Sequence, residues 1–365
     1  MTELTQIASL FAPQGEIAAI APYGNGNVND TYLVRPALGQ PFILQQLNGR
    51  VFQDPAAIMH NLRQVSGHLA AAHRTSRRSS SCWRVIEPLA TCTGADYHTD
   101  TRGGCWRALS YIDNAVAFDT IQSTAHGREI GFALGLFQRQ LADLDPTQLH
   151  DTLPGFHITP RYLAEFEAAW ASASPKMTPE IAYCRTFIDN AAPRATVLEA
   201  ARAEGRIRER IIHGDPKVAN ILLDRASGQA VALIDLDTVK PGLPHYDIGD
   251  CLRSACNPLG EEADEPTAVR FDLDLCQAIL TGYLTEAGAF LNPEEIALFP
   301  DAAWLIAFEL GLRFFTDQLR GNIYFKVQSP EQNLHRALVQ FHLAESIASQ
   351  LAPFRRLVAG LAGDA

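Results

Sequence analysis

Residues 211–220 read Ile-Ile-His-Gly-Asp-Pro-Lys-Val-Ala-Asn, a short apolar run that leads into a polar loop. The apolar run 221–223 follows, then a turn over 224–228 and a second apolar run at 231–234, which ends at Asp235. Apolar runs on either side of a turn rich in Asp, Ser and Gly predict an antiparallel hairpin. Because the outer ends of a tight hairpin lie side by side, we expect the loop with Asp215 and Asn220 to lie beside Asp235.

Three oxygen-bearing side chains would meet at this point, and such a group suits a hard divalent cation. Mg²⁺ keeps several waters and takes one or two protein carboxylates, so Asn220 and Asp235 are the candidate metal ligands. Asp215 then remains free to accept a proton or to orient a hydroxyl group. A loop Asp, a loop Asn and a strand-end Asp are the side chains that phosphoryl transfer uses. The alternative is a surface turn followed by an unrelated hairpin.

The pattern H-x-D-x-x-x-x-N, followed by an apolar strand and Ile-Asp, resembles the kinase-like phosphotransferases, which include aminoglycoside, choline and small-sugar kinases. Protein kinases have Arg after the His and Phe-Gly after the metal-binding Asp. This chain has Gly214 and Leu236-Asp237 at those places, which favours the small-molecule branch. The resemblance implies a two-lobed, protein-kinase-like α+β fold, with ATP as co-substrate and Mg²⁺ as cofactor.

The pattern of apolar residues changes along the chain in a way that fits two lobes. Short β-like runs lie at 17–20, 31–34, 42–46, 85–89 and 106–111. One helix interrupts them, and it begins at Asp54-Pro55, where Asp can cap the helix and Pro can occupy its first turn. Helical patterns then occupy 124–144, 159–173, 178–203, 264–287, 293–319 and 330–360. We therefore predict a β-rich N-lobe over 1–112 and a helical C-lobe over 113–365.

A glycine-containing segment lies between the first two predicted strands, where a phosphate-covering hairpin would lie. It reads Tyr23-Gly24-Asn25-Gly26-Asn27-Val28-Asn29. Glycine lets backbone N–H groups approach a phosphate closely, so Gly24 and Gly26 are candidate nucleotide contacts. An ordinary β-turn would have the same pattern. The resemblance further implies that a hinge at Tyr111 to Asp113 holds adenine.

The predicted helix at 302–319 carries Glu309, Arg313 and Asp317 at successive steps of four residues, so all three share one face. The remainder of that helix is strongly apolar, so this charged stripe either faces water or lines a polar cleft. The chain continues through Gly321-Asn322, Tyr324-Phe325 and Lys326.

This C-terminal segment resembles the G-x-R-F-L-x-D-Y-L-x-G-D-x-Y-F pattern of bacterial N-acetylhexosamine 1-kinases, and 42–48 and 156–160 resemble further segments of that family. The resemblance implies transfer of the ATP γ-phosphate to the anomeric hydroxyl of GlcNAc or GalNAc. The acceptor contacts it implies are Asn27, Asn29, Asp215, Glu309, Arg313 and Tyr324.

Two positions depart from the family pattern and leave the acceptor open. Asn27 stands where the family has His, and Gln318 stands where it has Tyr. The alternatives are a kinase of another small hydroxyl acceptor, of the choline, aminoglycoside or homoserine type, and a nucleotide-binding module without turnover.

The chain has few lysines, and this bears on how phosphate is bound. There are four, and none lies in the first 175 residues: Lys176, Lys217, Lys240 and Lys326. Protein kinases place a lysine on the third strand of the small lobe to pair the α- and β-phosphates. The nearest residue here is Gln45, a candidate nucleotide contact whose neutral amide can donate a hydrogen bond but supplies no charge. We therefore expect Lys217 to meet the γ-phosphate as a catalytic residue, and arginines such as Arg63 to help with the other phosphates.

The composition limits the functional classes. The 365 residues are 47% hydrophobic and carry a formal net charge of −11, which disfavours a nucleic-acid binder held by a basic face. No apolar run approaches the roughly 18 residues that span a bilayer. The N-terminus has an acid and no base before a short apolar stretch, which indicates an amphipathic helix and not a signal peptide. Seven cysteines without a C-x-x-C pair favour a reduced protein. We expect a cytoplasmic monomer or weak homodimer that binds ATP and a small sugar.

Overall fold

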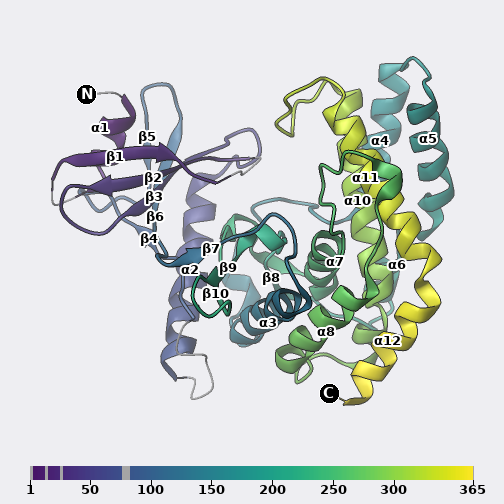
Figure 1. Ribbon diagram of the computed structural model, residues 1–365. Coiled ribbons are helices and arrows are strands. Elements are labelled where there is room, and N and C mark those ends of the chain that lie inside the picture. The colour runs from purple at the N-terminus through teal and green to yellow at the C-terminus, as the bar shows by residue number, and fades with distance from the viewer. Residues whose placement is uncertain (1–2, 13–14, 25–27, 76–82, 365) are drawn as a thin grey trace.

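The N-terminal region is an antiparallel sheet with one long helix beside it, as the computed structural model shows (Figure 1). The structure describes residues 3–12, 15–24, 28–75 and 83–364. The sheet has the order β1-β2-β3-β6-β4, and β5 pairs with β6. Its strands are β1 (Ile17–Pro22), β2 (Asp30–Pro36), β3 (Phe42–Leu47), β4 (Pro88–Leu89), β5 (His98–Thr99) and β6 (Cys105–Ser110). Four predicted strands are confirmed, whereas the run 85–89 is a strand only at its end and β5 was missed.

One face of this sheet is covered by α1 (Glu3–Ser9), so the N-terminal helix is confirmed. Ile7 and Phe11 pack against Val34, Phe42 and Leu44 of the central strands.

The long helix α2 (Pro55–Thr75) connects the sheet to the rest of the molecule. It begins after Asp54, whose side chain accepts a hydrogen bond from the Ala57 N–H, as the capping pattern predicts. The apolar side chains of Met59 and Leu62 belong to the large hydrophobic core that continues into the helical region. The helix therefore holds the two regions together.

The second region begins where the chain crosses to a small sheet. The chain leaves the first sheet at Ser110 and enters the second at β7 (Ala115–Val116), so the boundary that we propose at 112 falls between them. The second sheet has the order β10-β9-β7, and β11 pairs separately with β8. Besides β7, the sheet contains β9 (Ile221–Asp224) and β10 (Ala230–Leu233). The separate pair consists of β8 (Arg210–Ile212) and β11 (Lys240–Gly242).

The hairpin predicted around 224–228 is confirmed. Strands β9 and β10 are antiparallel, with Ile221 opposite Leu233 and Leu223 opposite Ala230. The two outer ends of the hairpin therefore lie together, as its spacing requires.

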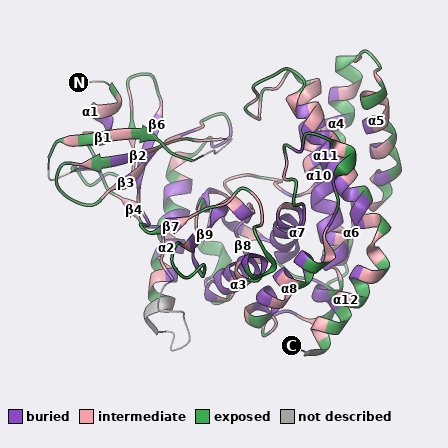
Figure 2. Ribbon diagram, viewed as in Figure 1, coloured by how far each residue is buried: buried purple, intermediate pink, exposed green. Residues whose placement is uncertain are grey.

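The rest of the molecule is helical, and the helix faces that point toward its interior are buried (Figure 2). The α-helices are α3 (Thr124–Gln140), α4 (Thr159–Ala173), α5 (Pro179–Ala191), α6 (Val197–Ala203), α7 (Pro244–Ala255), α8 (Leu273–Ala287), α9 (Pro293–Ala297), α10 (Phe299–Leu319), α11 (Gln332–Ser349) and α12 (Leu351–Asp364). Helices α3 and α8 pack closely because Gly131 of α3 has no side chain at their contact. A Cβ on Gly131 would lie 1.9 Å from the Ile279 carbonyl oxygen of α8.

Three long helices predicted from apolar periodicity are each divided in two. A new helix starts at or beside Pro300 and Pro353, and Pro193 lies in the short turn between α5 and α6. Proline lacks the N–H that continues a helix but fits its first turn. The apolar pattern continues across each break because the helices on both sides face the same core.

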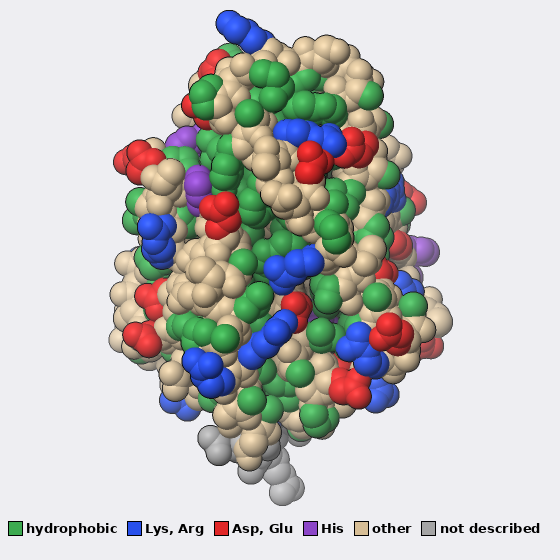
Figure 3. All heavy atoms as spheres, turned by 90° about the vertical axis from the view of Figure 1, so that its right-hand side faces the viewer, with side chains coloured by type: hydrophobic (Ala, Val, Ile, Leu, Met, Phe, Trp, Pro, Cys, Tyr) green, Lys and Arg blue, Asp and Glu red, His purple; other side chains and the backbone are tan. Residues whose placement is uncertain are grey.

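The surface shows no separation of charge on the face that Figure 3 presents, where basic and acidic side chains are interspersed. None of the helices in the described part of the chain is both long and apolar enough to cross a membrane. The six described cysteines are free thiols, and Cys82 lies outside the described residues.

Candidate active site

The loop after β8 is held by a carboxylate from α7. Asp247 is fully buried, and its two oxygens accept hydrogen bonds from the backbone N–H groups of His213 and Gly214, both at 2.8 Å. Gln138 of α3 donates a third bond to the same carboxylate, at 2.8 Å. Asp247 therefore fixes the backbone at the start of this loop. Arg253 of the same helix pairs with Asp250 and with Glu261.

This loop contacts the turn that follows β10. Gly214 has φ +86°, and a Cβ there would lie 2.8 Å from the Thr238 carbonyl oxygen. The Thr238 hydroxyl donates to the His213 carbonyl oxygen at 2.7 Å. A side chain at 214 would push the two segments apart, so glycine is required at this place.

Asp215 lies at the centre of the loop, with its side chain about 30% exposed. Its Oδ2 accepts hydrogen bonds from Lys217 Nζ at 2.9 Å and from Asn220 Nδ2 at 3.0 Å. Burial alone would raise the pKa of Asp215, but the Lys217 ammonium and its hydrogen bond hold it below its ordinary value. Asp215 is therefore a charged carboxylate near neutral pH. Asn220 also donates to the Asp215 backbone carbonyl at 2.7 Å, which orients its amide.

Asp235 lies next to this group, as the hairpin predicts. The Ile234 N–H donates to the Asn220 carbonyl at 2.9 Å, so the ends of the hairpin are bonded together. Asp235 has φ +65°, a left-handed conformation that turns the chain sharply. Its own desolvation, together with repulsion from Asp237 and Asp215, raises the pKa of Asp235 to about 7.

These donors fit a divalent cation. Asn220 and Asp235 offer an amide oxygen and a carboxylate, and the repulsion that raises the pKa of Asp235 is what a cation would relieve. Within the described residues, no group of three or more His, Cys, Asp or Glu side chains is arranged to hold a metal ion. Mg²⁺ in nucleotide sites commonly takes one or two protein ligands and phosphate oxygens, so the small donor set suits it.

The residues expected to contact nucleotide occupy the sheet edge and the chain crossing. Tyr23 and Tyr111 meet edge to face, with ring centroids 6.0 Å apart. Asp113 accepts from Arg84 at 2.8 Å, so its carboxylate is already paired. Gly24 has φ +76°, which only glycine adopts readily, whereas Gly26 and Asn27 lie outside the described residues.

Gln45 and Asn29 are used inside the protein. The Gln45 side-chain oxygen accepts from Arg107, and its amide donates to Thr31 at 3.1 Å. The Asn29 amide donates to Asp237 at 2.9 Å. The structure therefore favours supporting roles for Gln45 and Asn29 over the phosphate and acceptor contacts that we expected.

Glu309 lies behind the loop and not at an open surface. Only 1% of it is exposed, and its oxygens contact His157 Nδ1 at 2.9 Å and accept from the Thr159 hydroxyl at 2.7 Å. His157 Nε2 donates to the Gly214 carbonyl at 2.8 Å, because a carbonyl oxygen can only accept. Both Glu309 oxygens are thus occupied, and the structure favours a positioning role over the acceptor contact that we expected.

The contact between His157 and Glu309 should make stability depend on pH. Burial would lower the pKa of His157, but the Glu309 carboxylate and the Gly214 carbonyl raise it above its ordinary value of 6.5. A raised pKa stabilises the fold below about pH 6.5, and the contribution is lost as pH rises through the folded pKa. We expect the loss of unfolding free energy in His157→Gln to be larger at about pH 6 than at about pH 9.

Urea unfolding of the wild type and His157→Gln at the two pH values measures this difference. Glu309→Gln removes the carboxylate that raises the pKa of His157, and should abolish most of the pH dependence. An equal loss at both pH values in His157→Gln would contradict the prediction.

Arg313 lies in an aromatic box. Its guanidinium carbon is within 5.0 to 5.6 Å of four ring centroids, those of Phe156, Tyr162, Tyr324 and Phe325. It forms no ion pair with a carboxylate among the described residues. Burial would lower the pKa of Arg313, but the neighbouring tyrosines together with Glu309 and Asp215 raise it. Tyr324 contacts it through the phenol oxygen at 3.5 Å. Arg313 and Tyr324 are therefore brought together, as we expected.

Asp317 organises the loop after α10. Its carboxylate accepts from the backbone N–H groups of Ile323, Tyr324 and Phe325 at 2.9 to 3.0 Å. In Figure 1 this loop reaches toward the β1–β2 hairpin, and Lys326 Nζ lies 2.8 Å from Asp30 Oδ1. Gln318 accepts from the Leu334 N–H and so faces α11 and not the Arg313 box.

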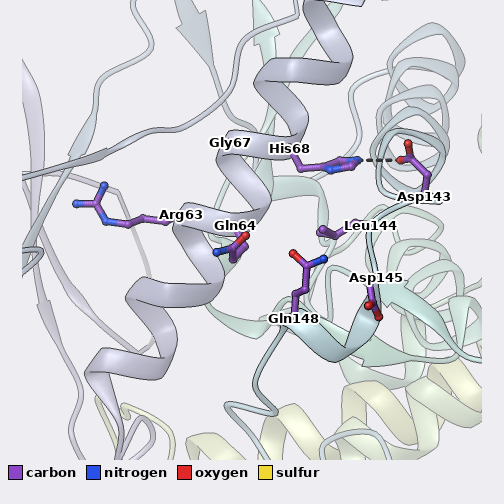
Figure 4. A pocket seen from close by; sticks show the side chains of 8 residues that line it. All are labelled: Arg63, Gln64, Gly67, His68, Asp143, Leu144, Asp145 and Gln148. Carbon is purple, nitrogen blue, oxygen red and sulfur yellow. Dashed lines mark hydrogen bonds and ion pairs between the residues drawn. The ribbon is translucent and has the colours of Figure 1, made fainter.

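Arg63 does not join this group. It pairs with Asp96, and it lines a different pocket of about 310 Å³ between α2 and the turn after α3. In Figure 4 its side chain points away from His68, which pairs with Asp143 at 2.8 Å. The phosphate role expected of Arg63 therefore finds no support in this structure, in which its guanidinium is paired with Asp96.

Comparison with known families decides the class of this site. Residues 19–279 match the phosphotransferase enzyme family known as APH. The chain belongs to this family. The structural neighbours of this phosphotransferase share its fold at low sequence identity.

Three of these neighbours cover nearly the whole chain. A microcompartment-associated aminopropanol kinase has a TM-score of 0.64 at 17% identity, covering 96% of this chain and 99% of its own. A choline/ethanolamine kinase family protein from Mesorhizobium loti has a TM-score of 0.55 at 15% identity, covering 99% of both chains. An amicoumacin kinase in complex with AMP-PNP, Ca²⁺ and amicoumacin has a TM-score of 0.52 at 13% identity, covering 93% of this chain and 84% of its own.

Sequence reasoning gave no role to Arg107, Asp237 or His157, which lie beside the candidate site. Arg107 and Asp237 each had a weak signal. Arg107 is the one charged residue in the strand 105–110, and Asp237 completes an Asp-Leu-Asp sequence. A charge inside an apolar strand requires a partner, but the strand alone does not say which one.

Proposed function

We propose that this APH-family phosphotransferase transfers the γ-phosphoryl group of ATP to the anomeric hydroxyl of an N-acetylhexosamine. Small-molecule phosphotransfer follows from family membership. The choice of a sugar is our proposal, and it rests on Arg313 together with the resemblance of the segment after α10 to the N-acetylhexosamine 1-kinases.

The Arg313 box is the observation that favours a neutral acceptor. A cationic acceptor such as choline or an aminoglycoside needs aromatic rings or carboxylates that are free to bind it. Here four rings already surround a guanidinium that forms no ion pair with a described carboxylate. A second cation would be repelled, whereas the hydroxyl and amide oxygens of an acetylated sugar would accept hydrogen bonds from the guanidinium.

The box is connected to the reacting loop through packed groups. Phe156, which lies under Arg313, has its ring 3.9 Å from that of His157. His157 in turn donates to the Gly214 carbonyl, one residue before Asp215. An acceptor held by Arg313 would therefore lie near the carboxylate that must meet its hydroxyl.

The roles of the other residues follow from their chemistry. In this proposal Asp215 orients the acceptor hydroxyl and takes its proton, and Lys217 offsets the negative charge that develops on the transferred group. Asn220 and Asp235 would hold Mg²⁺, which when bound neutralises charge on phosphate oxygens. Gly24 and the hairpin around it would cover the phosphates, and Tyr111 and Asp113 would flank adenine.

A panel of acceptors tests the proposal. We expect the purified protein with MgATP to release ADP in the presence of GlcNAc or GalNAc, with a sugar 1-phosphate as product by phosphorus NMR. The methyl glycosides of the same sugars lack a free anomeric hydroxyl and should give no product. ADP release with choline, an aminoglycoside or homoserine, or with the methyl glycosides, would overturn the choice of acceptor. Tight ATP binding without ADP release from any acceptor would favour a nucleotide-binding module.

Arg313→Met should weaken use of the sugar and leave nucleotide binding intact. A hydrogen bond from a charged donor contributes about 1.5–3 kcal/mol, so we expect kcat/KM for the sugar to fall by roughly 10- to 100-fold. The KM for ATP should change little, because no nucleotide candidate contacts Arg313. Arg320→Met is the matched control, since Arg320 is a half-exposed arginine near the end of the same helix that pairs with Glu165. An equal effect in both variants would remove Arg313 from the acceptor site.

A further inference from the structure

The N-terminal sheet places an arginine opposite the position at which protein kinases have a lysine. Arg107 of β6 is the direct partner of Gln45 of β3 in the antiparallel register. It is 1% exposed, and its Nε and Nη2 donate to the Gln45 side-chain oxygen at 3.1 and 2.8 Å. Gln45 is fixed in turn by its bond to Thr31 of β2. Three adjacent strands therefore hold one buried guanidinium in place.

The partner of Arg107 comes from the other lobe. Arg107 Nη1 lies 2.6 Å from Asp237 Oδ1, and both side chains are at most 2% exposed. The second oxygen of Asp237 accepts from Asn29 Nδ2 at 2.9 Å, at the end of the glycine-containing segment. Asp237 thus takes two partners from the small lobe, although it lies only two residues beyond Asp235.

We propose that the Arg107–Asp237 ion pair positions the metal-binding turn 235–238 against the small lobe. Arg107 is a positioning residue: its guanidinium is directed at Asp237 and Gln45, and it acts on Asp235 through the turn. This inference rests on the proposed function in one respect: the proposed function assigns the turn 235–238 to nucleotide and metal binding.

The charges explain why the turn needs such a partner. Asp235 and Asp237 are two carboxylates on one short turn, and like charges repel each other. The Arg107 guanidinium lies 2.6 Å from Asp237 Oδ1 and places an opposite charge beside this turn. Removing one member of a buried pair leaves the other charge buried without compensation, which is more damaging than removing both.

The geometry also explains why the residue is arginine. A planar guanidinium presents donors in several directions, so Arg107 reaches Gln45 and Asp237 at the same time. An ammonium group on a flexible stem is a single point charge and could not bridge the two as firmly. The lack of lysine in the small lobe is therefore consistent with a site built around Arg107.

A double-mutant cycle tests the pair. The variants are Arg107→Met, Asp237→Asn and their combination, with Arg107→Lys as the conservative replacement. We expect each single variant to need about 10- to 100-fold more Mg²⁺ for half-maximal binding of an ATP analogue, as for other partners of metal ligands. The double variant should lose clearly less than the product of the two single losses, and Arg107→Lys should lie between wild type and Arg107→Met.

Two measurements separate positioning from general stability. Hydrogen exchange of the amides in 235–239 should become faster in the single variants, and thermal unfolding reports whether each variant folds. Arg102→Met is the control, because Arg102 is an exposed small-lobe arginine paired with Glu3. It should change neither the Mg²⁺ requirement nor the exchange. Variants that only lower the unfolding temperature, with unchanged Mg²⁺ requirement and exchange, would overturn the proposal, and so would additive losses.

The test also distinguishes this inference from the proposed function. Neither nucleotide-analogue binding nor hydrogen exchange requires an acceptor. A non-additive cycle in a protein that phosphorylates no sugar would support the ion pair and reject the sugar kinase. An additive cycle in an active sugar kinase would do the reverse.

Discussion

Asp215→Asn is expected to fold and to bind nucleotide but to lose about 10²- to 10⁴-fold in kcat, the contribution typical of general base catalysis. Asn keeps the shape of the side chain and an oxygen that can accept from Lys217 and Asn220, so the loop should persist. It cannot take a proton from the acceptor hydroxyl. Single-turnover phosphotransfer, together with the dissociation constant for an ATP analogue, separates the chemical step from binding.

A matched control is Asp143→Asn. Asp143 is an exposed carboxylate that pairs with His68 at the pocket between α2 and α3 and lies outside the candidate site. It should keep wild-type kcat. Near-wild-type turnover in Asp215→Asn would show that Asp215 is not the residue that meets the hydroxyl.

Asp235→Asn is expected to reduce turnover by about a hundredfold or more, because a metal ligand stabilises transition-state charge by several kcal/mol. Asn is the right replacement for a conformational reason. Asp235 has φ +65°, and Asn adopts the left-handed region more readily than most residues do. The variant therefore removes one charge without forcing the turn to change, which Asp235→Ala would not ensure.

The measurement is activity against Mg²⁺ concentration. The half-saturating Mg²⁺ should rise in Asp235→Asn, and part of the activity should return at high Mg²⁺. Asp224→Asn, at the far end of the same hairpin, is the control, because the Asp224 carboxylate caps its own turn. An unchanged Mg²⁺ requirement in Asp235→Asn would exclude this carboxylate as a ligand.

The centre of the site was predictable because its parts are close in sequence. Asp215 and Asn220 lie on one loop, and a hairpin with a short turn must return Asp235 to the start of its first strand. Local hydrogen bonding alone makes this geometry, and the register of β9 and β10 confirms it. The β-rich and helical regions were predictable for a similar reason, since the period of the apolar residues changes near residue 114.

The charged stripe on α10 shows where this reasoning stops. Periodicity correctly placed Glu309, Arg313 and Asp317 on one face. It could not show that they have three different surroundings: a buried histidine, an aromatic box and a set of backbone N–H groups. Those partners come from distant segments, and no pattern within the helix specifies them.

The amino-acid sequence by itself determined the reacting loop, the hairpin and the two-lobed arrangement, because each depends on near neighbours or on the period of apolar residues. Only the tertiary structure decided how charge is distributed across the lobes. Arg107 and Asp237 are 130 positions apart in the sequence, yet they form one buried ion pair. A buried charge is costly unless an opposite charge lies beside it. Which opposite charge lies there depends on how distant segments pack in the folded protein, and not on neighbours in the sequence.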